Sequence, residues 1–192
     1  MTSAAAFAGL GWAATGVYIL AQGYVSWQQA YDERLYYKLN AIGAAGLTVS
    51  SAAIASWQSV AVNIFWLVIS ITSLLKTQTQ RQLTMSRWWV MAPLLAFSAS
   101  ALVWIEADRA VTYAVLGWSG SLLYCASYAL FTFHVIRRVR FLAYNCVAAV
   151  LLLPVYALQA NWPAFALSIV WALISASGCL AATNRRDKNQ PE

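Results

Sequence analysis

The sequence from Trp57 to Lys76 reads WQSVAVNIFWLVISITSLLK and carries no charge before its last residue. A run of about 20 apolar residues is long enough for one helix to cross the hydrocarbon core of a bilayer. The rest of the chain has the same character, because 61% of its residues are hydrophobic and only 9% are charged. An average soluble domain is about one quarter charged. The composition therefore predicts a membrane protein whose apolar surplus faces lipid.

Similar runs along the chain predict an all-α polytopic membrane protein with seven transmembrane helices. Two connections, at residues 56–57 and 161–163, are so short that the helices they join must be antiparallel neighbours. With seven spans, a chain of 192 residues has no room for a soluble domain of any size. The predicted spans cover about residues 8–25, 38–56, 58–76, 88–106, 111–131, 142–160 and 162–182.

The basic residues are divided unequally between the two sides of this arrangement. Of the 12 lysines and arginines, all except Arg109 fall on the side of the C-terminal tail. Cytoplasmic loops of membrane proteins are enriched in such residues. We therefore expect the N-terminus outside and the C-terminus in the cytoplasm. The net charge of +6 is then a signal of topology, and a nucleic-acid partner is not expected.

An internal repeat brings residues 10–76 onto residues 116–181, with one residue of slack in the first loop. Each half contains three predicted spans, and the fourth span lies between the halves. Both halves should therefore run in the same direction, related by an axis along the membrane normal. This division gives a first three-helix repeat at 1–76, a linker with the fourth helix at 77–110, a second repeat at 111–182 and a cytoplasmic tail at 183–192. The matched residues are Leu10-Gly11-Trp12 with Leu116-Gly117-Trp118, Tyr18 with Tyr124, Asn40 with Asn145, Ala55 with Ala160, Trp57 with Trp162 and Trp66 with Trp171.

Two parallel three-helix units joined by a linker helix resemble the SWEET sugar transporters and the PnuC vitamin-precursor transporters of the PQ-loop type. The strings YYKLNAIG at 36–43 and NIFW at 63–66 also resemble short bacterial three-helix membrane domains. The resemblance implies a facilitative transporter of a sugar or a nucleoside-like vitamin precursor in a bacterial inner membrane. Two features depart from these transporters: the Pro-Gln dipeptide is absent, and only Pro154 matches their hinge prolines.

Polar and aromatic residues share one face of the third span and one face of the seventh. Each span carries a set of three such residues. In each set the second residue follows the first by three positions and the third follows the first by seven, which places the set on one helix face. Both tryptophans fall near the bilayer centre, where an indole N–H needs a partner inside the protein. The pattern predicts a binding site for a small polar solute, formed by Asn63, Trp66, Ser70, Ser168, Trp171 and Ser175.

A second stripe adds Tyr18 on the first span and Tyr124 on the fifth to this predicted site. Small residues and hydroxyls at four-residue spacing are also how membrane helices pack against each other. Both stripes are therefore open to a purely structural interpretation. A packed, dry interface would favour that interpretation, and an open polar cavity would favour transport.

The matched Asn40 and Asn145 lie near the inner ends of their spans, and with Pro154 they are candidates for an intracellular gate. Helix capping or cross-linking by the two asparagines is an equal alternative. Ion-coupled transporters and intramembrane hydrolases normally require an ionisable residue inside the membrane. No such residue lies in the middle third of any predicted span.

The remaining expectations concern catalytic residues, metals, cofactors and partners. We expect no catalytic residues, no metal and no cofactor, because the sequence has no metal-ligand spacing and no activated nucleophile. The expected partners are the lipid bilayer and a small-molecule solute, and the sequence leaves room for a homo-oligomer. A membrane scaffold or accessory subunit on the same duplicated fold is the alternative function.

The charge distribution predicts the side of the membrane on which the chain ends. A reporter fused after Glu192 should be cytoplasmic, because the basic residues resist translocation. Paired fusions to green fluorescent protein and alkaline phosphatase would measure this, since each is active on one side only. Phosphatase activity from the fusion would contradict the predicted orientation.

Overall fold

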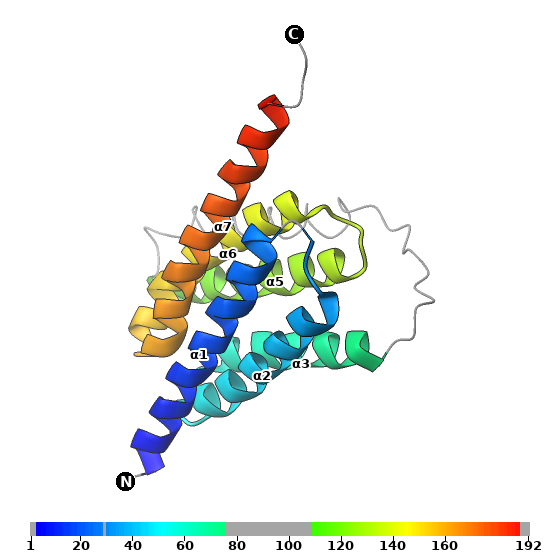
Figure 1. Ribbon diagram of the computed structural model, residues 1–192. Helices are drawn as coiled ribbons and strands as arrows, with labels where there is room; N and C mark the ends of the chain where they lie inside the picture. The colour runs from blue at the N-terminus through cyan, green and yellow to red at the C-terminus, as the bar shows by residue number, and fades with distance from the viewer. Residues whose placement is uncertain (1–2, 29, 76–108, 189–192) are drawn as a thin grey trace.

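The computed structural model describes residues 3–28, 30–75 and 109–188, and all of its regular structure is helical (Figure 1). This agrees with the all-α part of the prediction. The helices are α1 (Ser3–Trp27), α2 (Glu33–Ala52), α3 (Trp57–Leu75), α5 (Arg109–Thr132), α6 (Arg138–Leu158) and α7 (Trp162–Lys188).

The prediction of seven transmembrane helices is wrong. The described residues form six helices, and five of them are long and apolar enough to cross a membrane. The helix that falls short is α2, because Lys38 and Asn40 lower the hydropathy of the stretch that was assigned to the second span. The predicted fourth span, at 88–106, lies outside the described residues.

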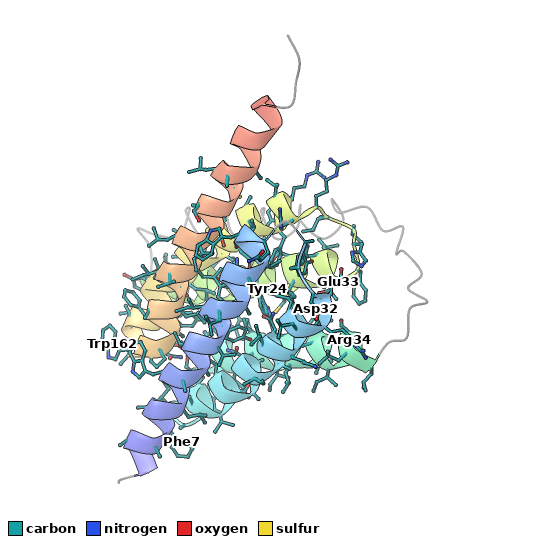
Figure 2. The ribbon with its side chains drawn as sticks, in the orientation of Figure 1. Phe7, Tyr24, Asp32, Glu33, Arg34 and Trp162 are labelled. Carbon is teal, nitrogen blue, oxygen red and sulfur yellow. The ribbon has the colours of Figure 1, made fainter. Side chains whose placement is uncertain are left out.

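α1 and α2 both begin five residues before the predicted spans, at Ser3 and Glu33. Asp32 caps α2, since its carboxylate accepts a hydrogen bond from the backbone N–H of Arg34 at 2.8 Å and its own backbone N–H donates to the hydroxyl of Tyr24 at 2.8 Å. Figure 2 shows these residues together in the connection between α1 and α2. Burial raises the pKa of Tyr31 in the same connection, and the nearby Glu33 acts in the same direction.

The turns after α2 and α6 have the same backbone geometry at equivalent positions. Ala55 and Ala160 both adopt left-handed conformations, with φ of 53° and 50°. In each turn the backbone N–H of the next residue donates to the carbonyl oxygen five residues earlier. Ser56 donates to Ser51 and Asn161 donates to Tyr156, with N···O distances of 3.0 Å in both. This is the hydrogen bond that ends a helix at a left-handed residue. It turns the chain directly into α3 and α7.

The six helices form a closed ring in the order α1, α2, α3, α5, α6, α7, in which α7 returns to α1. The helix pairs α1–α7 and α3–α5 join the two halves of the chain. Figure 1 shows α1 and α7 side by side, with the first turn of α1 and the last turn of α7 at opposite ends of the bundle.

Both joining pairs are parallel. Along α1 and α7, Thr15 bonds to the carbonyl of Pro163 and Gln22 bonds to Ser175, so residue numbers rise together on the two helices. Along α3 and α5, Ser70 bonds to Tyr128, and a Cβ on Gly117 would meet Gln58. The two three-helix halves therefore run in the same direction around the ring.

Glycines allow close approach between neighbouring helices. A Cβ added to Gly46 would lie 2.7 Å from the Cβ of Ala14, and one added to Gly120 would lie 2.7 Å from Leu152 and 3.1 Å from the carbonyl oxygen of Ala148. Small residues at helix interfaces are a general device of membrane proteins. They bring α1 against α2 and α5 against α6.

The packing at Gly120 predicts that Gly120→Ala destabilises the protein by about 1–3 kcal/mol, because a methyl group must be forced into a filled interface. Gly16→Ala is the matched control, since a Cβ at Gly16 meets nothing within 4 Å. Thermal unfolding in detergent would compare the two. Equal melting temperatures for both variants would show that the α5–α6 contact is looser than described.

Candidate functional site: a central aromatic cavity

Four aromatic side chains meet at the centre of the ring, each from a different helix. They are Tyr18 of α1, Trp66 of α3, Tyr124 of α5 and Trp171 of α7, and we call them the central aromatic cluster. The ring centroids of Trp66 and Trp171 are 5.2 Å apart. Tyr18 lies 5.6 Å from Trp66 and 5.4 Å from Trp171, and Tyr124 lies 6.2 Å and 5.8 Å from the same two rings.

The contacts of this cluster are reciprocal between the halves. Trp66 and Trp171 occupy equivalent positions and touch each other, so they lie beside the axis that relates the halves. Each tryptophan also contacts both the tyrosine of its own half and the tyrosine of the other half. The cluster is therefore the centre of the interface between the halves.

A cavity of about 30 Å³ lies within this cluster. A space of roughly 10–15 Å³ holds one water molecule, so the cavity has room for about two. It brings together six of the eight predicted binding residues, and none of the residues that line it is Asp, Glu, Lys, Arg or His. The six are Tyr18, Asn63, Trp66, Tyr124, Ser168 and Trp171.

A short chain of hydrogen bonds forms the polar wall of the cavity. The Tyr18 hydroxyl donates to Oδ1 of Asn63 at 3.0 Å, and Nδ2 of Asn63 donates to the carbonyl and the hydroxyl of Ser59 at 2.8 and 3.2 Å. Opposite, the Ser168 hydroxyl donates to the carbonyl of Ala164 at 2.9 Å. These bonds hold Asn63 and Ser168 in fixed orientations beside the aromatic rings.

The two tryptophans have polar atoms without partners. Trp66 is only 2% exposed and Trp171 only 4%. Within the part of the chain that the structure describes, neither indole nitrogen has a hydrogen-bond partner. A buried donor left in this state costs about 1–3 kcal/mol. The centre of the ring is thus able to offer hydrogen bonds that the surrounding residues do not use.

The other two predicted binding residues, Ser70 and Ser175, do not line the cavity. The Ser70 hydroxyl bonds to the Tyr128 hydroxyl at 2.8 Å, and Ser175 accepts from Nε2 of Gln22 at 2.9 Å. Each bond joins two parallel helices of different halves. Trp66 also stacks on Tyr128, with centroids 4.0 Å apart and planes 9° apart, so this level of the ring is packed.

The predicted gate residues have equivalent surroundings in the two halves. Asn40 and Asn145 are both fully buried, and each amide donates to the carbonyl four residues earlier, that of Tyr36 or Phe141, at 2.8 Å. Both Oδ1 atoms lack a partner among the described residues. Pro154 lies inside α6, half-buried, and does not line the cavity.

Sequence reasoning did not include Ser59 and Tyr156 in the site, although both line the cavity. They fall on the faces of α3 and α6 that already carry Asn63 and Asn145, at helical spacing, and this was the available signal. A polar network around Asn161, at the turns, was also not predicted. Among the described residues, no group of three His, Cys, Asp or Glu side chains could hold a metal ion.

Comparison with known proteins places the chain in a family through its repeat. One family model matches it twice, over residues 7–81 and 113–186. The chain belongs to that family. The two matches fall on α1–α3 and α5–α7, which shows the internal repeat, and the family's description names no activity. No curated protein and no solved structure matches the chain.

The Tyr18–Asn63 bond predicts the effect of removing one hydroxyl. Tyr18→Phe should destabilise the protein by about 1–3 kcal/mol, because Oδ1 of Asn63 would lose its donor inside the ring. Tyr144→Phe is the control: this half-buried hydroxyl makes none of the hydrogen bonds described, and the change should stay within about 0.5 kcal/mol. Thermal unfolding in detergent measures both. A neutral Tyr18→Phe would mean that water replaces the lost hydroxyl.

Proposed function

We propose that the protein is a facilitative transporter of a small neutral polar solute, a sugar or a nucleoside-like vitamin precursor, and that the central cavity is its binding site. The observation that carries the proposal is the position of this cavity. It lies between two parallel repeats, at their axis, and is lined by equivalent residues of both. A site at the interface of repeats is the usual position in transporters built from repeats.

The chemistry of the cavity supports a neutral solute. Its lining combines aromatic faces with an amide and hydroxyls and has no formal charge. Aromatic walls with a few fixed polar groups are typical of sites for small, partly stackable molecules. A coupling ion would need an ionisable or strongly coordinating group at this depth. Transport down a gradient fits the lining better than ion-coupled uptake.

The cavity measures about 30 Å³ and is too small for a sugar molecule, since sites for drug-sized ligands measure about 300–1,000 Å³. The proposal therefore takes this structure as an occluded form, from which the two halves separate to admit the solute. For the orientation, we propose an outside N-terminus and a cytoplasmic C-terminus in a bacterial inner membrane. The end of the ring that holds Arg34, Lys38 and Arg138 would then face the cytoplasm.

One observation favours the second candidate, a membrane scaffold or accessory subunit. Trp66 packs between Tyr128 and Trp171, and a tightly filled centre is what a permanent interface needs. The two functions differ in whether the centre binds a solute. A thermal-shift screen of sugars, nucleosides and vitamins on purified protein separates them, because a ligand that binds only the folded state raises its melting temperature.

For a solute found in that screen, Trp171→Ala should weaken binding about ten- to hundredfold, because stacking on an aromatic ring is worth roughly 1–3 kcal/mol. Uptake into proteoliposomes should fall with it. Trp57→Ala is the matched control, since Trp57 is 61% exposed and does not line the cavity. Unaltered binding by Trp171→Ala, or a protein that only loses its fold, would favour the scaffold.

A further inference from the structure

A second, larger pocket opens at the end of the ring where α1 begins. Its volume is about 480 Å³, and it lies between the first three turns of α1 and the connections α2–α3 and α6–α7. Figure 2 shows Phe7 and Trp162 at this end of the molecule, away from Tyr24 and Asp32. Phe7, Trp12 and Trp162 form aromatic walls, and Ser50 and Asn161 contribute polar groups. We call it the outer pocket.

A continuous series of hydrogen bonds leads from the outer pocket to the central cavity. It begins at Asn161, whose Nδ2 donates to the Ser51 hydroxyl at 3.3 Å. Ser51 bonds to Ser59 at 2.8 Å. Ser59 accepts from Nδ2 of Asn63 at 3.2 Å, and Asn63 accepts from Tyr18 at 3.0 Å. The last three residues line the central cavity.

After Asn161, the series runs only through residues of the first half. The positions equivalent to Ser51, Ser59 and Asn63 are Tyr156, Ala164 and Ser168. Ala164 has no side-chain hydrogen bond to offer, and Ser168 donates to its own helix. Tyr156, at the position of Ser51, lines the central cavity and hydrogen-bonds to Ser59 of the first half, so the second half does not repeat the series with its own residues.

Asn161 stands where this series crosses the axis between the halves. Its Nδ2 also donates to the hydroxyl of Ser56, the equivalent residue of the first half, at 3.0 Å. Ser56 donates in turn to Gln159, and Gln159 donates to Gln58 at 2.7 Å. Asn161 is only 1% exposed. The side chain thus ties together both turns above the cavity.

We propose that the solute enters the central cavity from the outer pocket, along Ser51 and Ser59 of the first half, and that Asn161 closes this route. The inference rests on the proposed function and adds the entry path and the kind of molecule that fits it. Serine hydroxyls and an amide both donate and accept hydrogen bonds. An uncharged solute with hydroxyl or amide groups can exchange bonds with each of them in turn.

The test compares cysteines at two equivalent positions, Ser59→Cys and Ala164→Cys, in a background in which Cys125, Cys146 and Cys179 are replaced by alanine. Both positions line the central cavity and are buried to a similar degree, 1% and 3% exposed. The probe is iodoacetamide, a small neutral amide. Its rate of reaction with each purified protein in detergent measures access to the two sides of the same cavity.

We expect iodoacetamide to modify Ser59→Cys faster than Ala164→Cys. Adding Asn161→Ala should accelerate the reaction of Ser59→Cys about tenfold, the equivalent of about 1.4 kcal/mol, because Asn161→Ala releases two hydrogen bonds across the turns. The same addition should leave Ala164→Cys nearly unchanged. Ser51→Ala should act like Asn161→Ala, whereas Tyr144→Phe, which removes a half-buried hydroxyl that does not line the central cavity, should not accelerate the reaction of Ser59→Cys.

Equal rates at the two cysteines, or equal acceleration of both by Asn161→Ala, would overturn the proposed route. Asn161 also caps α7, since Oδ1 accepts from the backbone N–H of Ala164 at 3.4 Å. Ser51→Ala leaves that cap intact and decides the matter if Asn161→Ala does not fold. The modification of the cysteines by iodoacetamide does not depend on transport of a solute. A selective effect at Ser59→Cys together with a failed solute screen would therefore refute transport and retain the route.

Discussion

Every polar side chain inside this ring has to find its partner within the protein, because hydrocarbon offers none. The bonds Tyr18–Asn63, Gln22–Ser175 and Ser70–Tyr128 meet that constraint by joining different helices. The last two connect the halves and set the parallel register of α1 with α7 and of α3 with α5. The arrangement of the central aromatic cluster follows from this register, since it brings four rings to one level.

The groups that do not meet the constraint are equally informative. The indole nitrogens of Trp66 and Trp171 and the Oδ1 atoms of Asn40 and Asn145 lack partners among the described residues. These four atoms form two equivalent pairs, with one member of each pair in each half, among the buried polar atoms that lack a partner. Leaving such groups buried costs free energy, and a bound polar molecule would recover part of it. This is the physical reason for proposing a polar solute although the cavity is small.

Much of the fold could be predicted from the sequence, and the reasons differ between elements. Long apolar runs gave five of the helices within a few residues at most boundaries, and the match of Trp66 with Trp171 led to the repeat. The start of α2 was missed because the cap at Asp32 precedes the apolar run. Periodicity placed Trp66 and Asn63 on the right face, but it could not show that Ser70 contacts Tyr128, because that depends on how two distant helices meet.

The reciprocal contacts of the central aromatic cluster have a consequence for the origin of the chain. Equivalent residues that touch one another, as Trp66 and Trp171 do, are the signature of an isologous interface, the kind found in two-fold symmetric homodimers. Each half could have met an identical copy in the same way. Once fused into one chain, the copies were free to diverge, and a homodimer could never hold Ser59 on one side of its axis and alanine on the other. Duplication thus allowed the two sides of this interior to differ, which the symmetry of a homodimer would have forbidden.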